Sequence, residues 1–184
     1  MNNLILNEMP TGSYMERTQF NVNKSDLTAA CAIDFTTQGE RFTEKVAGDR
    51  YIRLVLNHTS IDCARQLYRA LVKHDAKTLN IAGNGMHTLS SRKITQRRVN
   101  IWLHDVLILV HAHLPLQKLM SGGQSGLDIA AAVVGPLLNI PTEINFPQGF
   151  KQRLENGIDV LQSKDDVMLS IQTMQQELLA DLRA

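Results

Sequence analysis

Short hydrophobic runs rich in branched side chains alternate along the chain with longer stretches of helical spacing. The short runs predict four strands, at residues 50–56, 78–82, 116–120 and 140–146. The longer stretches, in which apolar residues recur every three or four positions, predict helices over residues 61–73, 95–113, 127–138 and 165–182. Strands that alternate with helices are typical of a mostly parallel sheet with helices on both faces. The predicted fold class is therefore α/β.

The first part of the chain shows little of this periodicity. Residues 1–30 are polar, and Pro10, Thr11 and Gly12 give a turn signal. We therefore expect an N-terminal extension or arm over residues 1–48, a loosely held segment of the kind that orders on a partner subunit. One α/β domain would follow over residues 49–184, a length that suits a single hydrophobic core.

Two glycine-rich turns directly follow predicted strands. The first is Gly83, Asn84 and Gly85, and the second consists of Ser121, Gly122, Gly123, Gln124, Ser125 and Gly126. Both turns, and a third that begins at Pro147, are expected at the edge where the carboxyl ends of parallel strands meet. Glycine lets a ligand approach the backbone, and N–H groups at a helix start attract anions. The sequence predicts a pocket there for a nucleotide or another phosphate-bearing ligand.

Several side chains around these turns are candidates for ligand contact. Asp128 either stabilises the helix start or holds a ribose hydroxyl or a base edge. Lys151 and Arg153 either clamp a phosphate or are solvated, and His87 also follows one of the turns. The candidate ligand-binding residues are Gly83, Asn84, Gly85, Ser121, Gly122, Gly123, Gln124, Ser125, Gly126, Asp128, Pro147, Gln148, Gly149, Lys151 and Arg153.

Composition narrows the function classes without identifying a ligand. The net charge is +1, whereas nucleic-acid-binding domains are usually clearly basic, so a nucleic-acid partner is not expected. Cys31 and Cys63 form no CxxC pair, which favours a reducing compartment. No apolar run approaches the roughly 20 residues of a membrane helix, and no signal peptide is apparent. We expect a cytoplasmic protein without a membrane span, and no metal site, because the histidines lack accompanying cysteines or an acidic cluster.

Within residues 77–160, the segments 119–132, 139–142 and 146–151 resemble the SGGQTGxD…GIP…PKG pattern of the SLOG superfamily, especially its molybdenum cofactor carriers and YpsA-like proteins. The resemblance implies a Rossmann-like fold, frequent homo-oligomers, and a pocket for a nucleotide or nucleotide-like ligand lined by the second glycine turn, Asp128 and the turn at 147–149. Gln148 stands where the carriers have lysine. The PGGxGTxxE pattern of the related cytokinin-activating phosphoribohydrolases is absent, so their activity is not implied.

Three functions remain open from the sequence. The leading hypothesis is binding, without turnover, of a nucleotide-derived small molecule such as a signalling nucleotide, by a sensor or a sequestering protein. The first alternative is hydrolysis of a nucleotide N-glycosidic or phosphate bond, with Asp128 as the candidate catalytic carboxylate and Arg97 or Arg98 as a clamp. The second is a carrier of the molybdenum cofactor. No other cofactor is indicated.

Overall fold

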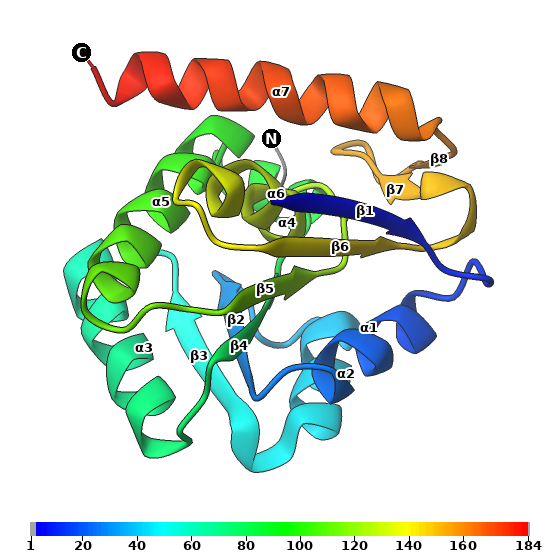
Figure 1. The fold of residues 1–184 in the computed structure, drawn as a ribbon. Helices are drawn as coiled ribbons and strands as arrows, with labels where there is room; N and C mark the ends of the chain where they lie inside the picture. The colour runs from blue at the N-terminus through cyan, green and yellow to red at the C-terminus, as the bar shows by residue number, and fades with distance from the viewer. Residues whose placement is uncertain (1–2, 184) are drawn as a thin grey trace.

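The computed structural model describes residues 3–183 and contains a six-stranded parallel sheet flanked by helices (Figure 1). The strands are β1 (Leu4–Glu8), β2 (Leu27–Ala32), β3 (Tyr51–Val55), β4 (Thr78–Gly83), β5 (Lys118–Ser121) and β6 (Thr142–Phe146). Their order across the sheet is β1-β6-β5-β4-β2-β3. A two-stranded antiparallel ribbon, β7 (Gln152–Arg153) and β8 (Asp159–Val160), follows β6. The predicted α/β class is confirmed.

Most of the helices begin at a residue whose side chain caps them. The α-helices are α1 (Tyr14–Asn23), α2 (Gln38–Ala47), α3 (Ser60–Lys73), α4 (Met86–Ser90), α5 (Gln96–His113), α6 (Leu127–Leu137) and α7 (Lys164–Asp181). Single turns of 3-10 helix lie at Gly48–Arg50 and Gln148–Phe150. Hydroxyl groups cap α1, α2, α3, α5 and α7, which satisfies backbone N–H groups of the first turn. Within residues 3–183, none of the helices is long and apolar enough to cross a membrane.

The N-terminal region differs from the loosely held arm expected over residues 1–48. Residues 1–2 and 184 lie outside the described residues, but β1 pairs with β6, and β2 lies between β4 and β3. Every residue of β2 is buried. This strand consists largely of alanine, threonine and cysteine and therefore lacks the branched and aromatic signal of the other strands, although it is apolar enough for a strand covered on both faces.

The direction of the crossovers decides which face each helix covers. The chain steps from β2 to β3 in one direction, and from β4 to β5 and β6 in the other. Because parallel crossovers are right-handed, steps in opposite directions put their helices on opposite faces. Accordingly α3, α5 and α6 cover one face, α1 and α2 cover the other, and α7 packs on α5 and α6 (Figure 1). The carboxyl ends of β2 and β4 thus form a topological switch point, where open α/β sheets bind ligands.

Candidate functional site

A cleft of about 690 Å³ opens at this switch point. Its walls are formed by α1, the first turns of α2, the end of β4 with the turn after it, and the turn after β5. The volume lies in the range of small-molecule and cofactor sites. The cleft therefore lies both at the switch point of the sheet and at the glycine turns predicted from the sequence, and it is the candidate ligand site.

The two predicted glycine turns lie against each other in this cleft. The N–H group of Leu127 donates to the carbonyl of Asn84 at 3.3 Å. A Cβ atom on Gly126, whose φ is +96°, would lie 2.4 Å from the same carbonyl oxygen. The side chain of Asn84 accepts from the N–H groups of Ile33 (3.0 Å) and Asp34 (2.9 Å) and so joins the turn after β4 to the loop after β2. The turns at three strand ends are thus tied into one surface.

The predicted ligand-binding residues divide into two groups. Those that line the cleft are Gly83, Asn84, Gly85, Gly122, Gln124, Asp128 and Arg153. Those that do not line it are Ser121, Gly123, Ser125, Gly126, Pro147, Gln148, Gly149 and Lys151. Several of this second group have internal partners instead: the hydroxyl of Ser121 donates to Ile81 O and that of Ser125 to Arg153 O, both at 2.6 Å.

The N–H groups around the start of α6, predicted to attract an anion, are partly used within the chain. Gly126 donates to the side-chain oxygen of Gln96 at 2.7 Å, and Gln124 donates to a carboxylate oxygen of Asp128 at 3.4 Å. The N–H of Leu127 is also used, because it donates to Asn84. Fewer backbone N–H groups are therefore free to bind an anion than the sequence suggests. Side chains therefore have to supply more of any anion recognition.

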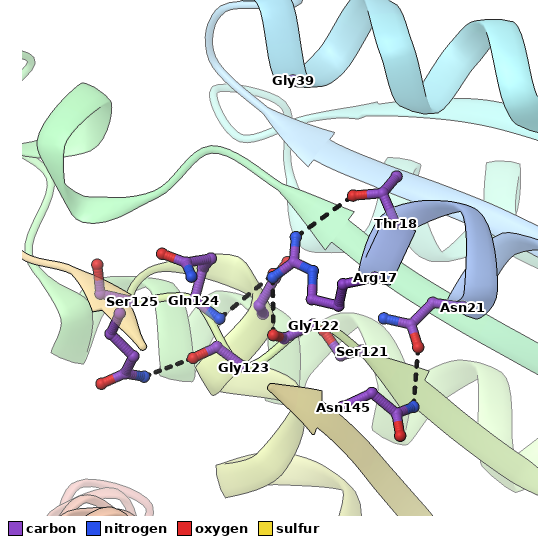
Figure 2. Close-up of polar contacts among 12 residues, drawn as sticks. Arg17, Thr18, Asn21, Gly39, Ser121, Gly122, Gly123, Gln124, Ser125 and Asn145 are labelled. Atoms are coloured by element: carbon purple, nitrogen blue, oxygen red, sulfur yellow. Dashed lines mark hydrogen bonds and ion pairs between the residues drawn. The ribbon is translucent and has the colours of Figure 1, made fainter. Parts of the chain in front are cut away.

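Arg17, on α1, forms a buried ion pair with Asp128. Its Nη1 atom donates to Asp128 Oδ2 at 3.0 Å and to the carbonyl of Gly122 at 2.7 Å, and Figure 2 shows the guanidinium group reaching over the Gly122 turn. Only 10% of the Arg17 side chain and 7% of the Asp128 side chain are exposed. Burial raises the pKa of Asp128, while Arg17 and the N–H of Gln124 oppose this.

The close approach of this pair explains the glycine at position 122. A Cβ atom there would lie 2.2 Å from Arg17 Nη1 and 2.6 Å from Asp128 Oδ2. Any side chain would therefore displace the ion pair. The glycine at this position makes room for protein side chains, although it was predicted to make room for a ligand.

Glu40 is a second buried carboxyl group in the cleft wall. It lies in the first turn of α2 and is only 4% exposed. One carboxyl oxygen is 3.5 Å from Asn84 Nδ2, and the other has no hydrogen-bond partner among residues 3–183. Burial, and next the charge of Asp128, raise the pKa of Glu40 to about 8, against the effects of Tyr51 and Asn84.

Positive charge gathers around the ring of Tyr14, which also lines the cleft. Lys151 Nζ lies 4.5 Å from the ring centroid, and the guanidinium groups of Arg153 and Arg17 lie 5.7 and 5.8 Å from it. Lys151 also donates to Gly12 O at 2.6 Å, and Arg153 pairs with Asp159 at 2.8 Å. These contacts hold the cations in fixed positions beside the cleft.

Other candidates from the sequence lie in different places. His87 lines the cleft, with Nδ1 3.1 Å from Glu155 O. Arg97, predicted as a clamp, instead pairs with Asp181 of α7, and Arg98 lines a separate, smaller cavity. Within the described part of the chain, no three His, Cys, Asp or Glu side chains come together in a way that could hold a metal ion.

Sequence reasoning missed Arg17 and Glu40. The signal for Glu40 was present, because Thr37 and Glu40 have the spacing of a capping box, which marks a helix start. In α1, Arg17 and Asn21 are four residues apart and share a face, and the side chain of Asn21 accepts a 2.8 Å bond from Asn145 (Figure 2). Because no helix was predicted at 14–23, that spacing did not indicate that the two side chains share a face.

A parallel sheet with a polar cleft at its switch point defines a Rossmann-like protein. More narrowly, the chain belongs to the circularly permutated YpsA family of SLOG proteins, whose family model matches residues 2–107. This confirms the SLOG and YpsA-like resemblance. The matched range contains Arg17 and Glu40 and ends before the turn at 121–126, so two separate parts of the chain indicate the same superfamily. No curated protein matches the chain.

Proposed function

We propose that the cleft binds a nucleotide-derived small molecule without chemical turnover. The observation that carries this proposal is the set of buried polar side chains, Arg17, Glu40 and Asp128, in a cleft of about 690 Å³ at the switch point of the sheet. Buried charged groups are costly unless they serve structure or a ligand. Membership of the SLOG family supports a nucleotide-related ligand.

The polar groups are distributed as a nucleotide would require. Arg153, which lines the cleft, and Lys151, which lies outside its lining beside Tyr14, supply positive charge for phosphate groups. Asn84, Glu40 and Asp128 supply hydrogen-bonding groups for a sugar or a base. Binding is favoured over hydrolysis because one carboxylate oxygen of Asp128, the candidate catalytic residue, already accepts hydrogen bonds from Arg17 and from the N–H of Gln124.

The experiment is extraction followed by titration. The purified protein is denatured, any released small molecule is identified by mass spectrometry, and the refolded or ligand-free protein is then titrated calorimetrically with AMP, NAD⁺ and ADP-ribose. We expect at least one of these nucleotides to bind wild type, and Gly122→Ala to weaken that binding strongly, because its Cβ would displace Arg17. Gly39→Ala is the matched control, because Gly39 lines the same cleft but its added Cβ would meet nothing within 4 Å.

Other outcomes would replace the proposal. Consumption of a nucleotide by wild type, lost in Asp128→Asn, would establish a hydrolase. Release of a molybdopterin derivative would establish a cofactor carrier. If no nucleotide binds and none is released, or if Gly122→Ala binds as wild type does, the cleft is not a nucleotide site.

A further inference from the structure

We propose that Glu40 contacts the ligand and donates a hydrogen bond from a protonated carboxyl group to a lone pair, such as a ring nitrogen or a carbonyl oxygen of a nucleobase. This inference rests on the proposed function and specifies one contact within it. It makes Glu40 a residue that determines specificity.

The position of Glu40 is unusual for its place in a helix. Thr37 caps α2 and accepts a bond from the N–H of Glu40 at 3.3 Å, as in a capping box. In a complete capping box the glutamate side chain returns to the backbone of the cap residue. Here the side chain lies in the cleft wall, where Glu40 is only 4% exposed. Glu40 is one of the residues that line the cleft.

One oxygen of this carboxyl group lacks a partner. Asn84 Nδ2 lies 3.5 Å from Oε1, whereas Oε2 has no hydrogen-bond partner among residues 3–183. The hydroxyl of Tyr51, a neighbour that lowers the pKa of Glu40, is likewise buried without a hydrogen-bond partner among residues 3–183. A buried polar atom without a partner is destabilising, so a ligand atom that supplies the missing bond would bind more tightly because of it.

The surroundings favour the protonated form. Asp128 on α6 and Asp34 in the loop after β2 both raise the pKa of Glu40, and burial is the largest cause, bringing it to about 8. Two further titratable groups interact with Glu40, the Tyr51 hydroxyl on β3 and the Cys31 thiol on β2, and the pKa values of both are raised. At neutral pH the group is therefore mostly a neutral donor, and it becomes an anion at higher pH.

This chemistry predicts a pH-dependent affinity. A ligand that requires the protonated form loses about tenfold in affinity per pH unit above the pKa, which gives about a 30-fold loss between pH 7 and pH 9.5. ADP-ribose and NAD⁺ are suitable probes, because neither adenine nor a pyrophosphate diester titrates in this window. Any change in affinity therefore comes from the protein.

The test is calorimetric titration of wild type, Glu40→Gln and Glu44→Gln with ADP-ribose and NAD⁺ at several pH values. The glutamine amide donates at every pH, so Glu40→Gln should bind within a few-fold of wild type at pH 7 and keep that affinity at pH 9.5. Glu44→Gln is the matched control: it removes a carboxylate one turn along the same helix, where Glu44 pairs with Arg53 and its side chain is 42% exposed. This variant should lose affinity with pH as wild type does.

The outcomes separate the two proposals. If wild type binds neither probe at pH 7, the role proposed for Glu40 fails, and the nucleotide site fails with it when AMP does not bind either and no nucleotide is released on denaturation. If wild type binds with an affinity that does not change with pH, or Glu40→Gln abolishes binding while remaining folded by circular dichroism, the nucleotide site stands and the protonated donor is refuted. The wild-type profile alone is decisive should Glu40→Gln fail to fold.

Discussion

Replacing Glu40 by glutamine should change how stability depends on pH, even without a ligand. Burial raises the pKa of Glu40 to about 8 in the folded protein, whereas an unfolded chain has a glutamate pKa of about 4.3. Between these two values the folded protein keeps a proton that the unfolded chain releases, so stability falls as the pH rises. The stabilising contribution of the neutral acid is complete below about pH 4.3 and is lost by about pH 8.

The size of the effect follows from the width of this window. Each pH unit is worth about 1.4 kcal/mol where the two states differ by one proton, which gives at most about 5 kcal/mol in total and about 2.5 kcal/mol between pH 5 and pH 7. Glutamine is nearly isosteric and does not titrate, so this part of the slope should be absent from Glu40→Gln. Between pH 5 and pH 8, the free energy of unfolding of the variant should therefore fall less than that of wild type.

Urea denaturation at pH 5, 6, 7 and 8 measures this directly. The free energies of unfolding of wild type and Glu40→Gln are compared as a difference, because pKa shifts at carboxyl groups away from Glu40, such as the lowered pKa of Asp26, largely cancel. Glu44→Gln, on the exposed side of α2, should follow wild type. Parallel curves for wild type and Glu40→Gln would show that Glu40 is ionised in the folded protein, and the reasoning would be refuted.

Three further predictions concern the ion pair, the glycine beneath it and the buried thiol. Arg17→Met leaves the buried carboxylate of Asp128 without its cation and should lower the free energy of unfolding by about 3–5 kcal/mol in urea titrations; a loss below about 1 kcal/mol would contradict a desolvated pair. Gly122→Ala should lower the melting temperature, whereas Gly39→Ala, at a helical position with open space, should raise stability by about 0.5–1 kcal/mol, and equal effects would contradict the clash. Cys31 is fully buried and its pKa is raised well above its usual value, so its modification by a thiol reagent, measured in Cys63→Ser, should need unfolding of the protein; rapid labelling under native conditions would contradict this.

The elements that the sequence predicts well are those whose own side chains carry the pattern. The helices α3, α5, α6 and α7 and the strands β3, β4, β5 and β6 all lie within two residues of the predicted bounds. Pro136 lies one residue before the end of α6. The N-terminal elements were missed because β2 has small residues in place of branched ones, and because α1 mixes buried polar residues with exposed apolar ones such as Met15.

The meeting of the two glycine turns was predictable, but the side-chain contacts around them were only partly so. Parallel strands bring their carboxyl ends to one edge, so the turns at 83–85 and 121–126 had to meet there. The turn at 147–149 was assigned to the same pocket, yet the N–H of Gly149 donates to the side chain of Glu8 at 2.6 Å, which ties that turn to β1. No local pattern indicates such a partner, because β1 lies beside β6 through long-range pairing alone.

The cleft is assembled from parts of the chain that are far apart in sequence. Arg17 comes from α1 and Asp128 from α6, and 111 residues separate them along the chain. Asn84 ties the turn after β4 to both sides, because it contacts the loop before α2 through its side chain and the start of α6 through its carbonyl. In a permutated family, the order of segments along the chain changes, but their neighbours in space are kept. Residues that meet in the cleft therefore define the site better than residues that share a sequence motif. The ion pair between Arg17 and Asp128 joins the segment that the family model matches to the glycine turn outside it, and this is the physical reason to treat both as one site.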